Sequence, residues 1–249
     1  MKIIRLFLLI IIGVLINSCD ENNPVDPFGF TSEVYSINGK LNEWNLGNNK
    51  KVIFLGAGDI WNSDKVYSTS KIDSTGNFSL NNLDSPTEVM FMNPVYPRFS
   101  DDVIFIRNTL TCSDSSAKQV WGYLVITLEE DTSLTNKGRI YRRNFNDWFY
   151  FSDDSVKAGD FIVEFIYADK DARLSGIIEY DYTHTYTNRK FHYTFEYNLN
   201  LKKGWNKEVT LVKSQEVSSD SGYTKIVTIR SVTNYEPMGG RWDYSYYGN

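Results

Sequence analysis

Histidine and the common nucleophile motifs offer little catalytic chemistry in this chain. Only two histidines occur among the 249 residues, His184 and His192. The alternating pattern around them predicts a hairpin that puts His184 on an aromatic face and His192, opposite Thr185, on a polar face. The sequence has no G-x-S-x-G, S-x-x-K or H-E-x-x-H motif. We therefore expect neither a histidine metal site nor a histidine-dependent nucleophile, and we expect the protein not to be an enzyme.

Carboxylates are the other source of chemistry, since calcium needs only oxygen ligands. Acidic side chains lie close together at four places: Asp153 with Asp154, Asp169 with Asp171, residues 129–131, and the predicted cross-strand pair Asp181 and Glu196. None of these groups has EF-hand spacing. Glycoside hydrolysis would need two carboxylates in one cleft, and the sequence does not select a pair. Metal-free acidic turns are the main expectation, with calcium binding and a carboxylate-dependent hydrolase as alternatives.

Tryptophans in polar stretches indicate a second kind of site, because aromatic rings stack on the faces of sugars. Trp44 lies in LNEWNLGN, Trp61 in GDIWNSDK and Trp148 in RRNFNDWFYF. Tryptophans of β-rich proteins usually belong to the core. The three residues are nevertheless the candidate ligand-binding residues, and a glycan is the ligand they would suit.

The amino-terminal segment has the features of a signal for covalent lipid attachment. Lys2 and Arg5 precede an uncharged apolar run over residues 6–16, which is shorter than the ~20 residues of a membrane span. The run ends in Ile16-Asn17-Ser18-Cys19, which resembles the lipobox of bacterial lipoproteins. The resemblance implies a signal peptide over residues 1–18. It also implies cleavage before Cys19, with diacylglycerol on the Cys19 thiol and an acyl chain such as palmitate as a further lipid on that residue.

Charge and cysteine content fit an envelope protein. Loss of Lys2 and Arg5 with the signal peptide changes the formal net charge from −5 to −7. The chain shows no basic stripe, so nucleic acid is not an expected partner. Cys112 is the remaining cysteine, which excludes an intramolecular disulfide in the mature chain. We expect it to be buried and inert.

A polar tether is expected at residues 19–33, where two prolines and several acidic residues follow the lipidated cysteine. The start Asp20-Glu21 resembles that of surface lipoproteins of the Bacteroidetes type. We therefore expect an outer-membrane location, with both sides of that membrane as alternatives and the outward side among them. Another envelope protein or a glycan is the expected partner.

The remaining chain predicts an all-β fold, with 15 % aromatic residues and no helical period. A continuous apolar run over residues 51–55 predicts a strand buried on both faces. Residues 66–72 alternate, with Val66 and Ile72 expected on one side. Strands are also predicted over 120–128, 161–168, 207–217, 223–232 and 242–247.

The clearest predicted element is an aromatic hairpin around the two histidines. Alternate residues from Ile178 to Tyr186 and from Phe191 to Leu199 are apolar or aromatic. A turn at Asn188-Arg189 would pair Tyr182 with Phe195 and Ile178 with Leu199. Both apolar sets then share one face.

The first part of the chain resembles the transthyretin-like, carboxypeptidase-regulatory type of β-sandwich. The resemblance rests on Asn38-Gly39-Lys40, Val52-Ile53-Phe54 and the turn Asp73-Ser74-Thr75-Gly76-Asn77-Phe78-Ser79-Leu80. In this turn, Asp73 caps the chain and Gly76 supplies a positive φ. The match covers about 60 residues and departs at 41–50, which is longer and richer in asparagine. Such domains are spacers or binding modules, so the resemblance implies no catalytic residue.

The sequence therefore predicts two antiparallel β-sandwich units, a transthyretin-like one over residues 34–110 and a larger one over 118–249. The polar stretch 108–117 is the expected boundary. The leading functional hypothesis is a non-catalytic binding or spacer module anchored at the cell envelope. The alternatives are a carbohydrate-binding accessory lipoprotein of a glycan-uptake system and a hydrolase. The second unit resembles uncharacterised secreted lipoproteins in the segment from Leu199 to Asn206, which assigns no activity.

Overall fold

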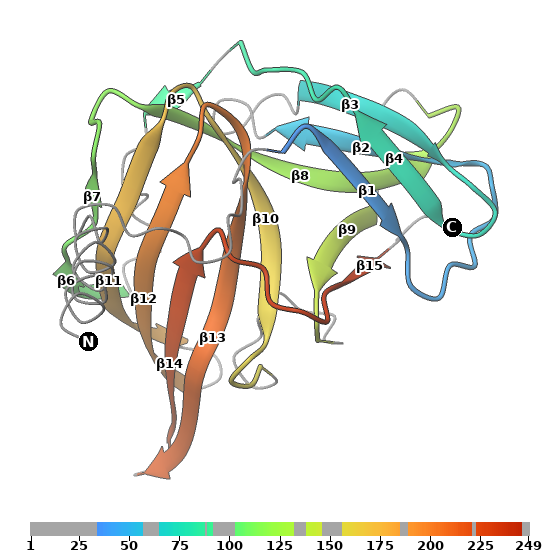
Figure 1. The fold of residues 1–249 in the computed structure, drawn as a ribbon. Coiled ribbons are helices and arrows are strands. Elements are labelled where there is room, and N and C mark those ends of the chain that lie inside the picture. The colour runs from blue at the N-terminus through green and yellow to red at the C-terminus, as the bar shows by residue number, and fades with distance from the viewer. Residues whose placement is uncertain are drawn as a thin grey trace, which may run out of the picture. The chain divides into compact units, whose positions relative to one another are not determined.

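The computed structural model describes residues 34–56, 65–87, 89–91, 103–131, 138–145, 156–184, 189–220 and 223–245, which belong to one compact unit spanning Ser32–Asn249. These residues form strands and turns and no helix, which confirms the all-β prediction. A helix able to cross a membrane is accordingly not found among them. The strands are β1 (Ser36–Lys40), β2 (Lys50–Gly56), β3 (Lys65–Ile72), β4 (Asn77–Asn81), β5 (Met90–Phe91), β6 (Val103–Asn108), β7 (Thr111–Cys112), β8 (Lys118–Leu128), β9 (Gly138–Arg143), β10 (Phe161–Ala168), β11 (Ala172–His184), β12 (Arg189–Leu201), β13 (Gly204–Asp220), β14 (Tyr223–Thr233) and β15 (Arg241–Ser245) (Figure 1).

A single large sheet joins the two predicted units. Its order is β3-β2-β8-β9-β10-β13-β14-β12-β11-β6, with β5 beside β8, β7 beside β11 and β15 beside β9. Strand β2 pairs with β8 from Lys50–Leu128 to Gly56–Gly122, so hydrogen bonds run across the expected boundary at 108–117. That stretch itself contains β7. The division into two separate sandwiches is therefore not confirmed.

The antiparallel pair β1–β4 forms a second layer that packs on one side of the large sheet. Ile37, Phe78 and Leu80 of this layer are at most 4 % exposed. They share a core cluster with Phe54, Phe165 and other side chains of β2, β3, β8, β9, β10, β13 and β15. Burial of this apolar surface holds the layer in place.

Trp205 lies at the centre of this core. Its ring contacts Phe54 at a centroid distance of 4.6 Å, and Tyr67 and Tyr167 at 5.4 Å each, in edge-to-face arrangements that aromatic pairs favour. Its indole N–H donates to the Asp84 carbonyl at 2.9 Å. Gly122 leaves room for the cluster, because a Cβ there would lie 2.4 Å from the Phe54 ring.

Strands β10 and β2 form as predicted. Strand β10 covers residues 161–168 with the expected alternation, and β2 buries Val52, Ile53, Phe54 and Leu55 on both of its faces. The prediction that Val66 and Ile72 lie on the same side of their strand was wrong. The register with β2 passes from the pair Phe54–Ser68 to the pair Leu55–Val66 and skips Tyr67, and this bulge reverses the alternation. Val66 is consequently 50 % exposed, whereas Ile72 is buried.

The aromatic hairpin exists as β11–β12, but its predicted register was wrong by four residues. Tyr182 pairs with Phe191 and Ile178 with Phe195, and the pairing ends at His184–Arg189. Four residues thus separate the strands where a two-residue turn was expected. Because the shift is even, the aromatic side chains still share one face, and neighbouring rings contact one another from Tyr180 to Tyr197.

Strand β14 is inserted between two strands that are consecutive in the chain. Only Lys202 and Lys203 separate β12 from β13, yet β14 lies between them, parallel to β12 and antiparallel to β13 (Figure 1). Asn234, just after β14, joins both neighbours. Its Oδ1 accepts the Asn200 N–H at 2.7 Å, and its Nδ2 donates to the Lys207 carbonyl at 2.8 Å.

Candidate functional site

Trp44 is the one predicted site residue for which the structure gives an environment. Cys19, Trp61 and Trp148 lie outside the described residues, so their proposed roles stay predictions. Trp44 is half-buried in the 41–49 loop, where its indole N–H donates to the Gly47 carbonyl at 2.8 Å. The ring meets Tyr244 edge-on at 5.2 Å. These contacts fix the loop and leave part of the indole exposed.

Gly76 connects Trp44 to the turn that the sequence singled out. The turn forms as predicted, with φ of 86° at Gly76. A Cβ at this position would lie 2.6 Å from Cβ of Trp44. The glycine therefore meets two requirements at once, the left-handed backbone and the close approach of the tryptophan loop.

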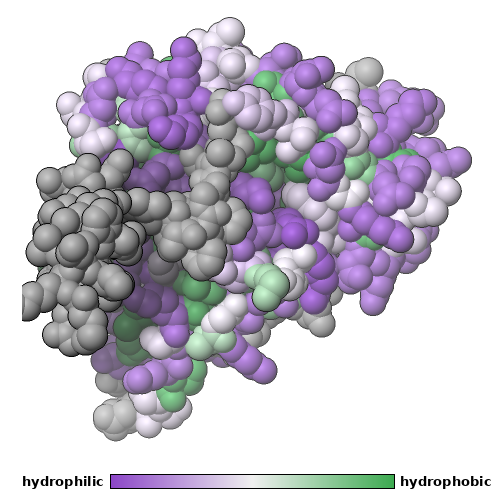
Figure 2. Space-filling model, in the orientation of Figure 1, coloured by the Kyte–Doolittle hydropathy of each residue, from purple (hydrophilic) through white to green (hydrophobic). Residues whose placement is uncertain are grey.

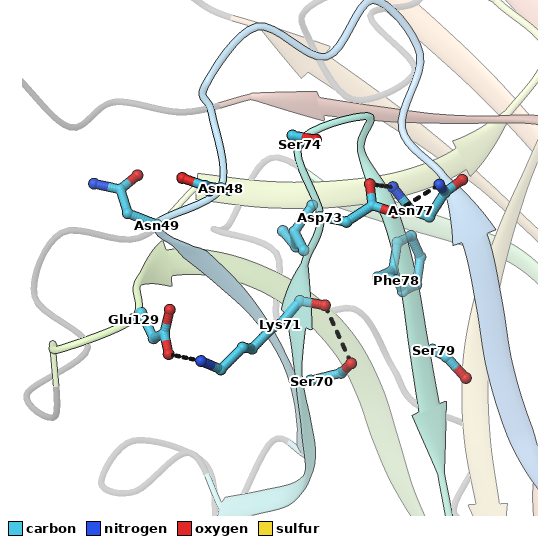
Figure 3. Close-up of a pocket in the computed structure, with 11 residues that line it drawn as sticks. Asn48, Asn49, Ser70, Lys71, Asp73, Ser74, Asn77, Phe78, Ser79 and Glu129 are labelled. Carbon is cyan, nitrogen blue, oxygen red and sulfur yellow. Dashed lines mark hydrogen bonds and ion pairs between the residues drawn. The ribbon is translucent and has the colours of Figure 1, made fainter.

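An open groove of about 790 Å³ runs beside this turn. Figure 3 shows Asn48, Asn49 and Glu129 on one side of it and Asp73, Asn77 and Ser79 on the other, with Lys71 between them. The groove thus combines the loop before β2, the turn between β3 and β4, and the residues after β8. Most of the residues that line it carry amide, hydroxyl or charged groups, with Ile72 and Phe78 as the apolar members, and about half of the lining surface is apolar.

Part of this polar lining is fixed by internal bonds. Lys71 forms an ion pair with Glu129, and Ser79 donates to Asn38 Oδ1 at 2.5 Å. By contrast, Asn48 and Ser74 make no side-chain hydrogen bond to other described residues and are exposed. They supply donors and acceptors for a ligand.

Asp73 is the most constrained acid of the groove. Its Oδ1 accepts the N–H groups of Thr75 and Asn77 at 2.8 and 2.9 Å, and its Oδ2 accepts Asn77 Nδ2 at 2.8 Å. Hydrogen bonds from the Asn77 side chain and backbone, followed by that from the Thr75 hydroxyl, hold the pKa of Asp73 far below its usual value. The groove therefore keeps one fixed negative charge at any pH the cell meets.

The histidine prediction needs a correction in its details. His192 lies opposite Asp181, not Thr185. Its Nδ1 is 2.7 Å from Asp181 Oδ1 and its Nε2 is 3.4 Å from Glu179 Oε1. Both ring nitrogens thus face carboxylates of the neighbouring strand β11. His184 pairs with Arg189 at the end of β11.

Most acids of the predicted clusters that the structure describes are used in protein contacts; the exposed Glu130 is an exception. The expected pair of Asp181 and Glu196 does not exist, because Glu196 lies opposite Ile177 and bonds Lys213 at 2.6 Å. Asp169 accepts the Lys118 N–H, and Asp171 the Lys203 N–H and Lys202 Nζ. Across the described segments, no three His, Cys, Asp or Glu side chains are grouped to hold a metal ion. Asp153 and Asp154 lie outside these segments.

The structure reveals a carboxylate pair that the sequence reasoning missed. Glu164 of β10 lies directly opposite Glu208 of β13, and both side chains are half-buried. Neither makes a hydrogen bond or ion pair with another described residue. Burial raises the pKa of Glu164, with Arg139 opposing that effect, whereas burial together with the Glu164 charge raises the pKa of Glu208 to about 8. The sequence feature that could have indicated this pair is Glu164 itself, a single acid in the otherwise apolar strand FIVEFIYA.

Among the described residues, the cavity next to this pair is far smaller than a substrate-binding cleft. Glu164, but not Glu208, lines a cavity of about 30 Å³ between β8, β9 and β10, together with Arg139 and Tyr141. Such a volume holds roughly one water molecule. A sugar ring cannot enter it, so the described geometry does not favour the hydrolase alternative.

Cys112 is only partly buried, in contrast to the expected full burial. Its Sγ is 3.1 Å from the Asp114 carbonyl, and the side chain packs against the cluster that contains Leu174 and Leu199. It therefore behaves as a small apolar side chain at the end of β7.

Comparison with known proteins identifies no relative of this chain. No family model matches the sequence, and neither a curated protein nor a solved structure is significantly similar to it. The functional argument therefore rests on the groove and the sequence.

Proposed function

We propose that this protein is a non-catalytic binding module, anchored to the cell envelope by lipid on Cys19, and that the groove beside the 73–77 turn binds a glycan. The observation that carries the proposal is the composition of this groove, which is large, open and lined by amides, hydroxyls and fixed charges. The runner-up is a spacer role, in which the same turn only stabilises the fold.

A sugar suits this lining for chemical reasons. Each hydroxyl of a sugar both donates and accepts, as do the amide of Asn48 and the hydroxyl of Ser74. The locked carboxylate of Asp73 adds an acceptor that costs no reorganisation on binding. The groove is wide and open to solvent, whereas sites for a single small molecule usually enclose most of their ligand. This openness suits a chain of sugar residues. Trp44, which packs next to Gly76 and stays partly exposed, adds an aromatic side chain near this turn for contact with a sugar ring.

Binding is tested on a glycan array with the mature protein and the variants Asn48→Ala, Ser74→Ala and Asn42→Ala. Asn42 is the matched control, because it is exposed in the same loop but does not line the groove. We expect the first two variants to weaken binding about tenfold, the equivalent of ~1.4 kcal/mol, and the control to bind like wild type. If no glycan binds, or if all variants bind a glycan equally well, the groove is not a glycan site and the spacer role becomes the proposed function.

The anchor is tested separately, in the cells that make the protein. Cys19→Ala should abolish acylation and release the protein from the membrane fraction; continued acylation of this variant would refute the anchor. Protease shaving of intact cells then reports the side of the membrane. Cleavage in intact cells supports a surface position and glycan capture, whereas protection with cleavage after lysis supports a periplasmic position.

A further inference from the structure

Asp73 differs from the other polar residues of the groove in the hydrogen bonds that it can make with a ligand. Amides and hydroxyls, which belong to most of the polar lining residues, both donate and accept. An ionised carboxylate can only accept, and among the described lining residues the carboxylates are those of Asp73 and Glu129. Glu129 is already in an ion pair with Lys71 (Figure 3). Asp73 is therefore the lining residue that requires a donor from a ligand.

The two carboxylate oxygens of Asp73 are used unequally. Oδ1 accepts three hydrogen bonds, from the N–H and the hydroxyl of Thr75 at 2.8 Å each and from the Asn77 N–H at 2.9 Å. Oδ2 accepts one hydrogen bond from the described residues, that of Asn77 Nδ2 at 2.8 Å. A carboxylate has about four acceptor sites on its two oxygens, so Oδ2 keeps one of them open on an exposed side chain. The bonds to Oδ1 hold the carboxylate, which cannot turn away from an unsuitable ligand group without breaking them.

The charge of Asp73 also has no compensating cation in the groove. The side chain makes no ion pair with a described residue, and hydrogen bonds from the turn, above all those of Asn77, keep its pKa far below the usual value. Lys71 is held by Glu129, and Lys40, which lies opposite Asn77 in the β1–β4 register, does not line the groove. A ligand group beside Oδ2 therefore meets an uncompensated negative charge.

We propose that Asp73 is the specificity-determining residue of the groove. The groove then admits glycans that present a hydroxyl or an ammonium group to Oδ2 and rejects glycans that carry a carboxylate or a sulfate there. This inference rests on the proposed glycan site and names the class of sugar that the site takes. A carboxylate or sulfate has no hydrogen to donate, so two acceptors of like charge would face each other, and such a repulsive element excludes unwanted ligands. Asn48 and Ser74 can offer either a donor or an acceptor, so they do not discriminate between the two classes.

The inference is tested with pairs of glycans that share a backbone and differ in charge, using the mature lipidated protein in an uncharged detergent. The pairs are methyl-esterified and de-esterified homogalacturonan, a glucan and a glucuronan of the same linkage, and oligosaccharides of chitin and chitosan. At low salt we expect the uncharged member of the first two pairs to bind about tenfold more tightly, because like charges ~5 Å apart in water repel and one hydrogen bond is lost. Chitosan, which carries ammonium groups, should bind at least as tightly as chitin.

Two variants and a change of salt identify the residue responsible. Asp73→Asn keeps an oxygen to accept the Thr75 and Asn77 N–H groups but removes the charge, so it should lose most of the preference for the uncharged glycan. Asp84→Asn is the matched control, because Asp84 is exposed but does not line the groove, and it should keep the preference. A melting temperature like that of wild type would show that Asp73→Asn is folded. In wild type, a rise from about 0.01 M to about 0.5 M salt should reduce the preference, because salt screens the repulsion.

The outcomes separate this inference from the proposed function. Wild type that binds the acidic glycans as tightly as their uncharged partners, or more tightly, would overturn the role of Asp73 and leave the glycan site in place. A preference that Asp73→Asn retains, or one that salt leaves unchanged, would also overturn it. Absence of binding to every one of these glycans would overturn the glycan site and this inference together.

Discussion

The two sides of strand β10 are both withdrawn from solvent but differ in chemistry. One side, with Phe165 and Tyr167, joins the core under β1–β4, where edge-to-face rings surround Trp205. The other side carries Glu164 against Glu208. Figure 2 shows a mainly hydrophilic surface over β1–β4, whereas hydrophobic side chains are visible between the lower parts of the strands near β12 and β14. The packing on the aromatic side of β10 should stabilise the fold equally at every pH. The contribution of the Glu164–Glu208 side should change with pH.

Truncation of Trp205 should produce the largest effect, because it empties the centre of the core under β1–β4. The side chain is 3 % exposed and contacts three aromatic rings. We expect Trp205→Ala to lower the free energy of unfolding by about 3–5 kcal/mol, measured by urea denaturation at a fixed pH. Met238→Ala is the control, since Met238 is 96 % exposed and should change stability by less than about 0.5 kcal/mol. A loss for Trp205→Ala below about 1 kcal/mol would mean that this core is not the main source of stability.

The Glu164–Glu208 pair should make stability fall as pH rises. The folded-state pKa of Glu208 is about 8, above the unfolded value of 4.5, so the folded state binds more protons between these two pH values. Stability is then fully present below about pH 4.5 and is lost through pH 8. The difference between 8 and 4.5, at about 1.4 kcal/mol per pKa unit, gives an upper bound of about 5 kcal/mol. Water that reaches the half-buried side chains lowers the expected loss to about 2–4 kcal/mol.

Urea denaturation at pH 5 and at pH 8 measures this effect. Glu208→Gln removes the titrating group while keeping its shape, so it should be more stable than wild type at pH 8 and should show a flatter pH profile. A wild-type protein equally stable at both pH values would show that the pair is solvated. The comparison between the two sides of β10 would then fail.

Removal of the Tyr197 hydroxyl should produce the smallest effect. Burial, followed by the charge of Glu208, raises the pKa of Tyr197, so the phenol stays protonated at every pH considered. We expect Tyr197→Phe to change the unfolding free energy by less than about 1 kcal/mol and to leave the pH dependence of stability unchanged. A clear change in that dependence would place Tyr197 within the titrating group and extend the pair to three residues.

The sequence was sufficient for those elements that depend on local chemistry or on the period of two along a strand. Strands β2 and β10 and the Asp73–Gly76 turn were predictable, because burial, alternation and the positive φ of glycine are local properties. The aromatic face of β11–β12 survived an error of four residues in register, because only odd shifts exchange the two faces. The bulge at Tyr67 was not predictable, because it depends on the partner strand.

The candidate site was predictable only in part. The sequence identified Trp44 and the 73–77 turn separately, and their contact across Gly76 is a result of the fold. The partnership of Glu164 and Glu208 depends on the pairing of β10 with β13, which lie about 40 residues apart in the chain. Sequence reasoning selected Asp181 and Glu196 instead because it assigned the wrong turn to the hairpin. Non-local pairing thus limited both parts of the prediction.

The insertion of β14 between β12 and β13 constrains how this protein is made. Until residues 223–233 have been synthesised and delivered, one edge of β12 and one edge of β13 lack their partner. The sheet therefore cannot be completed progressively as the chain emerges, because β14, one of the last strands, is the described strand that joins its two halves. A truncation before Tyr223 would remove an interior strand and expose two open edges, which favours aggregation. A cell that makes this protein therefore needs to keep the incomplete chain apart from other copies until its carboxyl-terminal segment arrives.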